Sequence, residues 1–459
     1  MDVFSPWADP GDEMDPGGCI DQGLGFHSSR LSLLRGTTSQ GFSVISASLR
    51  LILPLPHMFP ALLIFLGTYL VLAVGRLPGF RVDRTGAAII GASLMIAFRV
   101  LSLDEAFRAI NYETIILLFG MMIVVANLRL SGFFAVISTW VVEHAHHPLA
   151  LLSGIVLVSG VFSAFFVNDT MCLVLTPLVL EIVVQLNRRP IPYLLAVAMA
   201  SNIGSVATIT GNPQNMMIGT FSHIPYRVFA ARLAPVAGMG LVLTVLLIAL
   251  VYRKEFTGAR HVDIPKPRVR VNRVLLWKSV IAAGVMIVLF FAGWPVAKVA
   301  VVTGAALLIT RRVKPEKVYR EIDWQLLVLF AGLFVVIAGV EKALLSQDLG
   351  GIASHFSLNR VAVLSLLSAL LSNVVSNVPA VLVFKPFVER LANAHQAWLV
   401  LAMSSTLAGN LTLLGSIANL IVVERARHEV RISFLEYLRV GVPLTILTVA
   451  IGMLMLSRV

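Results

Sequence analysis

"TITGNPQNMMIG", residues 208–219, lies within a run from Pro190 to Tyr226 that contains no Asp, Glu, Lys or Arg. The run is long enough to cross a membrane, because about 20 apolar residues span a bilayer as a helix. Its centre, however, holds glycine, asparagine, proline and glutamine. Lipid offers no hydrogen bonds, so unwound backbone at membrane depth persists only where it is buried in protein or lines a cavity. The stretch therefore predicts a broken membrane helix beside a binding site.

The composition indicates an all-α polytopic membrane protein. Of the 459 residues, 58% are hydrophobic and 13% are charged, whereas a soluble domain carries about 25% charged residues. Charge-free runs of membrane length recur along the chain, at 51–75, 148–168, 233–252, 279–297, 324–340, 361–384, 391–423 and 440–457. The net charge of +12 fits basic cytoplasmic loops better than a nucleic-acid partner. The two cysteines form neither a disulfide framework nor a metal set.

The first 57 residues differ from the rest. They are rich in Gly, Ser, Pro and acidic residues without periodicity, which predicts disorder. They lack the basic start and short apolar core of a signal peptide. The membrane pattern begins at Met58 with "MFPALLIFLGTYLVLAVG". We expect residues 1–57 to be a disordered extension that is not part of the native protein.

Three segments of the first half recur, in the same order, in the second half. The pairs are 110–128 with 322–340, 167–179 with 376–388, and 198–215 with 402–419. The last pair shares six residues in eighteen, and the offset drifts only from 212 to 204. Chance similarity between apolar segments would explain one such pair. Three pairs in register predict a duplication.

Loop charges indicate that the two halves have opposite orientation. The loops 253–274 and 311–322 are strongly basic, so we expect both to be cytoplasmic. The counterpart of the second loop is 99–110, where basic and acidic residues balance. The sequence thus predicts a first transmembrane repeat at 58–252, a basic cytoplasmic linker at 253–274, and a second, inverted repeat at 275–459. Inverted repeats place a transport site at the membrane midplane between the halves.

The broken helix has the residues for a restart. Gly211 permits a turn, Asn212 is a good N-cap, and Pro213 suits the first helical position. The restarted helix would aim free N–H groups and a positive dipole end at the midplane, which favours an anion or a solute that accepts hydrogen bonds. The second half repeats the device with Gly415 and Ser416. A kinked helix without a ligand is the alternative.

A second polar break has the form of a hairpin. Apolar arms at 149–167 and 171–186 flank "NDT" (168–170), and arms at 361–375 and 380–391 flank "SNVP" (376–379). We expect two re-entrant hairpins whose tips reach the depth of the broken helices. Asn168 and Asp169 would cap the first returning arm, and Pro379 suits a first helical position in the second. Two full crossings joined by a short turn are the alternative, and loop charges do not separate the two.

These motifs resemble the ion transporter superfamily. "FFVNDTMCLVLTP", "SNIGSVATITGNPQNMMIG" and "LSNVVSNVPAVLV" are similar to the hairpins and the broken helix of its citrate-transporter-like branch, which includes anion permeases, arsenite permeases and NhaD-type sodium–proton antiporters. The resemblance covers nearly all of 58–459. It implies alternating access and a homodimer.

The resemblance also implies residues that bind ions or substrate. Sodium would be bound in one half by Asn168, Thr170, Gly211 and Asn215, and in the other by Ser376, Asn377, Gly415 and Asn419. In the dicarboxylate–sodium branch the tips are Ser-Asn-Thr. Here the first tip carries Asp169, whose negative charge argues against a dicarboxylate substrate.

Two ionisable residues lie inside the apolar arms, where charges are usually functional. Asp169 is the candidate for a proton or sodium site, and a pure helix cap is the alternative. Lys385 is the candidate counter-charge or anion attractor, and a snorkelling lysine is the alternative. Glu113 and Asp323 are interpreted as ordinary acids of a first helical turn, and Cys172 as packing.

The function that follows is an ion-coupled secondary transporter for a small anion or an arsenite-like solute. A sodium–proton antiporter is the alternative. A membrane-embedded enzyme is remote, because the sequence has no zinc-helix, Walker or nucleophile-elbow motif. We expect no cofactor apart from a coupling H⁺ or Na⁺, a small-molecule or inorganic ion substrate, a lipid bilayer as surroundings and no nucleic acid. The expected location is the inner (plasma) membrane.

Overall fold

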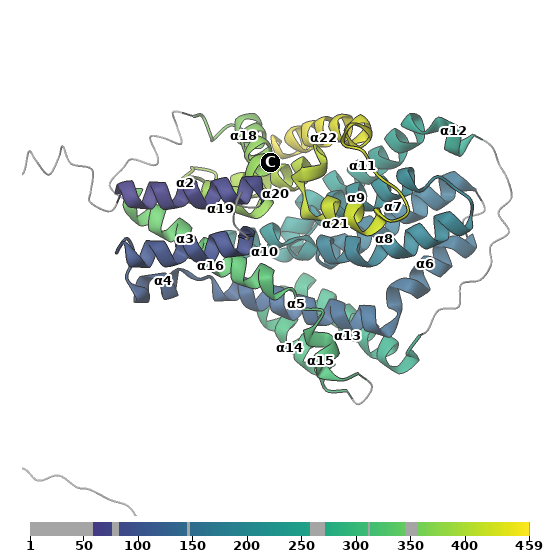
Figure 1. The fold of residues 1–459 in the computed structure, drawn as a ribbon, viewed down its shortest axis with the longest axis horizontal. Helices are drawn as coiled ribbons and strands as arrows, with labels where there is room; N and C mark the ends of the chain where they lie inside the picture. Colours follow the sequence, from purple (N-terminus) through teal and green to yellow (C-terminus); the bar gives the residue numbers. More distant parts are fainter. Residues whose placement is uncertain are drawn as a thin grey trace, which may run out of the picture. The chain divides into compact units, whose positions relative to one another are not determined.

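The structure is a computed structural model that describes residues 58–75, 82–144, 147–257, 271–310, 313–344 and 356–458. Within these ranges the chain is α-helical with short 3-10 turns and without strands (Figure 1). The predicted extension 1–57 lies outside the described residues, as do 258–270 of the basic linker and Arg311 and Arg312 of the second basic loop. The all-α prediction is confirmed for the described part of the chain.

The helices of the first half end at the basic linker. They are α2 (Met58–Val74), α3 (Arg84–Ala97), α4 (Leu103–Ala109), α5 (Tyr112–Ser131), α6 (Phe133–His144), α7 (Pro148–Phe165), α8 (Asn168–Gln185), α9 (Pro190–Ser205), η1 (Ile209–Gly211), α10 (Pro213–Ser222) and α11 (Tyr226–Val251), and the short α12 (Arg253–Phe256) lies in the linker itself. Four of them, α5, α7, α8 and α11, are long and apolar enough to cross a membrane.

The second half repeats this order. Its described helices are α13 (Arg273–Phe291), α14 (Val296–Leu308), α15 (Pro315–Tyr319), α16 (Trp324–Leu344), α18 (Val361–Val375), α19 (Asn377–Val388), α20 (Ala394–Leu407), η2 (Ala408–Asn410), η3 (Leu413–Gly415), α21 (Ile417–Ala426) and α22 (Phe434–Leu456). Three of these, α13, α16 and α22, are long and apolar enough to cross a membrane. Seven such helices in the described residues agree with a multi-pass protein.

Polar caps fix where the two matched long helices begin. Asn111 Oδ1 accepts a 2.8 Å hydrogen bond from Thr114 N at the start of α5. Asp323 Oδ1 accepts a 2.9 Å bond from Leu326 N at the start of α16. Each cap satisfies one of the free N–H groups of a first helical turn. Gly132, with φ 87°, ends α5 in the left-handed conformation that glycine adopts without strain.

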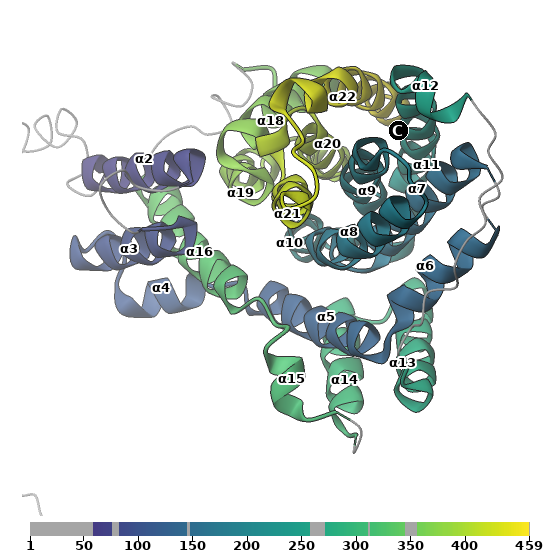
Figure 2. The same cartoon turned by 45° about the vertical axis from the view of Figure 1, so that its right-hand side comes forward.

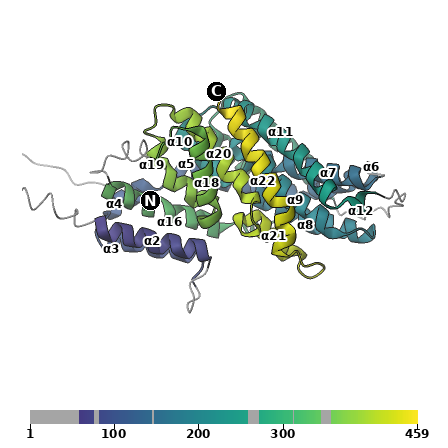
Figure 3. The same cartoon turned by 90° about the horizontal axis from the view of Figure 1, so that it is seen from above.

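The helices of the two halves exchange partners. Figure 2 shows α16 beside α2, α3 and α4, and α5 beside α13, α14 and α15. The long helix of each half thus packs against the short helices of the other half, and we call these two groups the scaffold. The helices α7 to α11 and α18 to α22 gather into a separate cluster, the hairpin cluster. Within it, α11 and α22 run side by side (Figure 3).

Glycines at the scaffold contacts show that the exchange is reciprocal. A Cβ on Gly120 of α5 would lie 2.6 Å from backbone atoms of Ala300 in α14, and one on Gly332 of α16 would lie 2.8 Å from the Ala88 carbonyl oxygen in α3. At the repeat offset of 212, Gly332 corresponds to Gly120 and Ala300 corresponds to Ala88. Reciprocal contacts of this kind are the mark of a two-fold relation. They support the predicted duplication, while the opposite membrane orientation stays a prediction.

Helix length favours a re-entrant second hairpin. The 12 residues of α19 extend about 18 Å at 1.5 Å per residue, which is too short for the roughly 30 Å hydrocarbon core. The arms α7 and α8 have 18 residues each and could cross by length. The capping prediction for Asn168 and Asp169 was wrong, because α8 already begins at Asn168 without a side-chain cap. Pro379 is the third residue of α19, which begins at Asn377.

The reciprocal glycines generate a prediction about stability. Gly120→Ala and Gly332→Ala should each destabilise the protein by about 1–3 kcal/mol, because the added methyl group meets backbone that cannot rotate away. Thermal unfolding of the purified protein in detergent measures the effect.

The matched control is Gly284→Ala in α13, where a Cβ would meet nothing within 4 Å. This change should be neutral or stabilising by up to about 1 kcal/mol, because alanine is the better helix former. Equal melting temperatures for all three variants would contradict the close reciprocal packing.

Candidate functional site

Both broken helices restart with a polar cap, as predicted. Asn212 Oδ1 accepts a 2.8 Å hydrogen bond from Asn215 N, and α10 begins with Pro213 at its first turn. Ser416 Oγ accepts a 3.2 Å bond from Ala418 N at the start of α21. The caps satisfy part of the exposed backbone N–H groups of each restarted helix.

An asparagine closes each unwound loop in the same way. Asn215 Nδ2 donates to the carbonyls of Ser205 and Thr208, both at 3.0 Å. Asn419 Nδ2 donates to the carbonyls ten and seven residues before it, at 2.7 and 3.2 Å. The carboxamides replace the helical donors that the unwound backbone lacks, which is why these buried carbonyls are tolerated at this depth. The repeated Asn in the sequence was the signal for this arrangement.

Gly211 and Gly415 are required for packing inside the loops. A Cβ on Gly211 would lie 2.1 Å from the Ser205 carbonyl oxygen, and one on Gly415 would lie 2.6 Å from Asn373 Oδ1 and 3.0 Å from the Gly409 carbonyl oxygen. These directions are filled by the protein itself. The two glycines therefore allow neighbouring segments of this chain to pack closely. This is a different role from the turn that the sequence predicts for Gly211.

Asn202, which the sequence analysis did not single out, joins the two halves. Its Nδ2 donates to Asn410 Oδ1 at 2.8 Å and to Asn419 Oδ1 at 3.0 Å. Its Oδ1 accepts from Asn168 Nδ2 at 3.1 Å and from Ser416 Oγ at 3.0 Å. All four hydrogen-bonding positions of this fully buried carboxamide are used. One side chain thus connects the first hairpin tip with the second broken helix.

The reverse connection runs through Thr406, the counterpart of Asn202 in the repeat. Its Oγ1 accepts from Asn212 Nδ2 at 3.2 Å and from Gln214 Nε2 at 3.1 Å. Asn212 corresponds to Ser416, so the end of α9 binds the second restart and the end of α20 binds the first. The centre of the hairpin cluster is a reciprocal network of uncharged polar side chains, which we call the polar centre.

The two hairpin tips differ in their free oxygens. Asn377 Oδ1 accepts a 2.6 Å bond from Ser372 Oγ, and the preceding Ser376 has a positive φ of 80°, a strained conformation for a residue with a side chain. By contrast, the Oδ1 atoms of Asn168 and Asn215 are buried without a donor. A buried acceptor without a partner calls for an explanation such as an ion. The Oδ1 atoms of Asn168 and Asn215 are therefore free, whereas those of the matching Asn377 and Asn419 already accept hydrogen bonds.

Asp169 and Thr170 line a cavity of about 90 Å³, the first-hairpin cavity. Its polar lining residues are Arg129, Asp169, Thr170, Glu321 and Asp323. Arg129 and Glu321 form an ion pair across the cavity wall. The structure therefore brings Asp169 together with Asp323, which sequence reasoning had dismissed as an ordinary first-turn acid. No sequence signal linked them, because they belong to different halves.

Lys385 lies in another cavity, of about 340 Å³, which we call the second-hairpin cavity. Its Nζ is 3.0 Å from Glu341 Oε1 and 3.3 Å from Glu389 Oε2, and it lies 5.4 Å from the ring centroid of Phe221. The sequence interpretation of Lys385 as a counter-charge for Asp169 was wrong in this respect. The two side chains line different cavities, and Lys385 already has two carboxylate partners.

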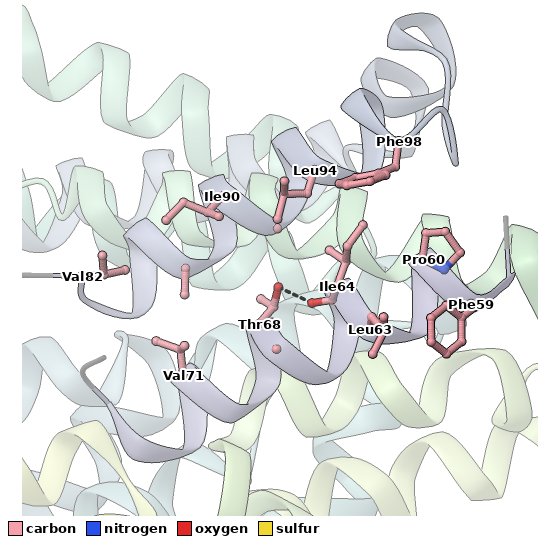
Figure 4. Close-up of a pocket in the computed structure, with 13 residues that line it drawn as sticks. Phe59, Pro60, Leu63, Ile64, Thr68, Val71, Val82, Ile90, Leu94 and Phe98 are labelled. Atoms are coloured by element: carbon pink, nitrogen blue, oxygen red, sulfur yellow. Dashed lines mark hydrogen bonds between the residues drawn. The ribbon is translucent and has the colours of Figure 1, made fainter. Parts of the chain in front are cut away.

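A third hollow, of about 520 Å³, lies between α2 and α3. Figure 4 shows apolar side chains around it, with the Thr68 hydroxyl donating to the Ile64 carbonyl. A hydrophilic solute would lose its hydration there without gaining hydrogen bonds. The apolar lining of this groove therefore makes it unsuitable as a site for a polar substrate.

Comparisons with known proteins agree with this architecture. The family model described as citrate transporter matches residues 62–408. The silicon efflux transporter LSI3 of Oryza sativa subsp. japonica is 31% identical over 468 residues, which cover 86% of this chain and 96% of the relative. The putative transporter arsB of Dictyostelium discoideum is 26% identical over 487 residues, which cover 81% and 86%.

A solved structure shows the same fold. The YdaH transporter of Alcanivorax borkumensis, whose crystal structure is described as having an unusual topology, superimposes with a TM-score of 0.61 at 13% identity, covering 88% of this chain and 97% of that one. The matched family model covers most of the chain. The chain therefore belongs to the citrate transporter family, whose members are transporters and not enzymes.

Asn202 provides a test of the polar centre. Asn202→Asp keeps the shape and the acceptor but removes both donors, so the Oδ1 atoms of Asn410 and Asn419 would face a carboxylate. Each orphaned buried acceptor costs about 1–3 kcal/mol, and we expect a marked loss of thermal stability and of solute flux.

Asn187→Asp is the matched control, since Asn187 is exposed and its positive φ of 50° suits aspartate equally well. It should leave melting and flux unchanged. If Asn202→Asp behaved like Asn187→Asp, the network around Asn202 would be dispensable and the polar centre would need another explanation.

Proposed function

We propose that this member of the citrate transporter family is an ion-coupled secondary transporter for a small uncharged oxyacid of the arsenite type. The observation that carries the proposal is the chemistry of the polar centre. The residues that meet there, Asn168, Asn202, Thr406, Ser416 and Asn419, present carboxamides and hydroxyls without a cation among them. These side chains bond one another in this structure, and a neutral hydroxylated solute would replace some of these bonds with its own.

An anionic substrate fits this centre less well. Moving a carboxylate out of water costs several kcal/mol unless a positive group pairs with it. The ionisable side chain at the first tip is Asp169, which would repel an anion, and Lys385 is held by two carboxylates in the other cavity. The restarted helices α10 and α21 still favour oxygen lone pairs through their positive ends. The sequence predicts either a small anion or an arsenite-like solute as substrate, and these features favour the arsenite-like solute.

The name of one relative supports the same solute class. The rice relative is named for silicon efflux, and dissolved silicon at neutral pH is an uncharged tetrahydroxy acid. Arsenite at neutral pH is likewise an uncharged trihydroxy acid. A site of amide and hydroxyl groups suits both chemically, because each solute donates and accepts hydrogen bonds without carrying a charge.

Coupling would use the first half of the molecule. Asp169 is the candidate for H⁺ or Na⁺, and the unpaired oxygens of Asn168 and Asn215 are candidate sodium ligands, with Thr170 and Gly211 at the same tip and loop. Sodium–proton antiport is a second candidate function, favoured by these same free oxygens. In the second half, Asn377 and Asn419 already have donors on their Oδ1 atoms, so a matching cation site there is disfavoured.

Alternating access would use the two hairpin cavities, each opening to one side of the membrane. In this scheme the protein lies in the inner (plasma) membrane with the loops 253–274 and 311–322 in the cytoplasm, and it assembles as a homodimer. The basic residues of those loops support the orientation. Membrane embedding follows from the seven apolar helices among the described residues and from the family.

A substrate panel tests the solute class. Proteoliposomes should accumulate arsenite or silicic acid under an imposed pH or sodium gradient, and citrate or arsenate should not compete at equal concentration, because both are anions at neutral pH. Accumulation of citrate with no arsenite or silicic acid flux would contradict the proposal. Proton release on sodium addition without any solute would favour the antiporter.

Asp169 tests the coupling. Asp169→Asn should remove the dependence of accumulation on the gradient while some downhill flux remains. The reason is that a neutral amide can neither take up and release a proton nor balance the charge of a sodium ion. The matched control is Asp104→Asn, an exposed acid paired with Arg108 in the short helix α4. Full gradient-driven accumulation by Asp169→Asn would assign the coupling ion to neutral oxygens alone.

A further inference from the structure

The two hairpin cavities are copies of one another. Each lies between a long scaffold helix and the returning arm of a hairpin. Corresponding residues line them in pairs: Met122 with Phe334, Ala126 with Ala338, and Leu173 with Leu382. The duplication therefore supplies an internal control, because a residue that the fold requires in one cavity should recur in the other.

The acids of the first-hairpin cavity do not recur. At the position that corresponds to Asp169 the second hairpin has Val378, and at the position that corresponds to Asp323 the first half has Asn111. The second-hairpin cavity instead joins scaffold to hairpin by an attractive pair, Glu341 with Lys385. Between scaffold and hairpin, the second-hairpin cavity thus has two opposite charges, whereas the first-hairpin cavity has the two negative charges of Asp323 and Asp169.

Capping does not explain the charge of Asp323. Asp323 and Asn111 cap α16 and α5 with nearly the same geometry, at 2.9 and 2.8 Å. Asparagine caps a helix about as well as aspartate does, and the first half shows that an asparagine suffices at this point of the fold. The carboxylate at 323 is therefore available for another role.

The other charges of the cavity leave the two aspartates without an ion-pair partner among the described residues. The scaffold helix α5 contributes Arg129, which pairs with Glu321 from the turn before α16. The helix α21 contributes only the apolar Ile421. Of these two lining residues, Asp323 is exposed and Asp169 is half-buried at the tip. Beside Asp169, the buried Asn168 has an Oδ1 without a donor.

We propose that Asp323 is the outer residue of a cation path that leads to Asp169 in the first-hairpin cavity. The ligand is a monovalent cation, H⁺ or Na⁺, that the exposed carboxylate draws from water and passes to the tip. A cleft lined by charges of one sign concentrates ions of the opposite sign. The inference rests on the proposed ion coupling and adds to it a residue from the scaffold.

The path also relates cation binding to movement. Asp169 belongs to the hairpin cluster and Asp323 to the scaffold, so any shift between the two groups changes the separation of the carboxylates. Like charges at short range repel, and a cation between them removes the repulsion. Closure of this cavity is therefore favoured when the cation is bound.

The test compares Asp323→Asn with the unmodified protein in proteoliposomes. The half-saturating cation concentration for solute accumulation is measured twice, with Na⁺ varied at fixed pH and with pH varied in choline chloride. At low ionic strength, Asp323→Asn should raise the half-saturating concentration of the coupling ion by about tenfold. The increase should be seen with Na⁺ varied if Na⁺ is the coupling ion, and with pH varied if H⁺ is. The difference should shrink at high choline chloride, because salt screens an exposed charge.

Asp83→Asn is the matched control, since Asp83 also caps a helix with its Oδ1, 2.8 Å from Gly86 N, but lies in neither hairpin cavity. It should leave the half-saturating concentration unchanged. If Asp323→Asn matched Asp83→Asn, or if its shift were the same at every ionic strength, the cation path would be refuted. If the unmodified protein showed no cation dependence at all, the proposed coupling itself would fail.

Discussion

Hydrogen bonds that the bilayer cannot supply are the constraint on which the rest of this structure depends. Two membrane helices are broken, and every carbonyl and N–H group exposed by the breaks needs a partner within the protein. Asn215 and Asn419 close their own loops, while Asn202 and Thr406 each reach across to the restart of the other half. The unwound segments are therefore stable only when both halves are assembled around the polar centre.

The reciprocal contacts explain how one duplication can serve two purposes. At the scaffold, Gly120 and Gly332 repeat the same close packing, because backbone contact admits little variation. At the hairpin tips the copies have diverged. The first tip has a carboxylate and the free oxygen of Asn168, whereas at the second tip the matching oxygen of Asn377 accepts from Ser372. The symmetric packing and the asymmetric polar groups thus involve different residues.

Much of this architecture could be predicted from the sequence, since helix propensity, caps and repeats are local signals. The restarts at Pro213 and after Ser416, and the pairing of the repeats, were found in this way. Asn202 was missed because it lies in an apolar helix without a motif, and its partners are more than 200 residues away. Asp323 was underrated for the same reason, since only the exchange of scaffold helices brings it to Asp169. Lys385 was assigned to the wrong cavity because the sequence does not show that each hairpin lines a cavity of its own.

In the proposed mechanism, the two related cavities open to opposite sides of the membrane. The most direct measurement places a single cysteine at Thr170 or at Ala338, both partly exposed in their cavities. Cys19 and Cys172 are first replaced by serine, and sealed vesicles are labelled with a membrane-impermeant thiol reagent from each side. We expect the reagent to reach position 170 from one side and position 338 from the other, and transported solute to change the two labelling rates in opposite directions. Labelling of both positions from the same side would contradict the proposed mechanism.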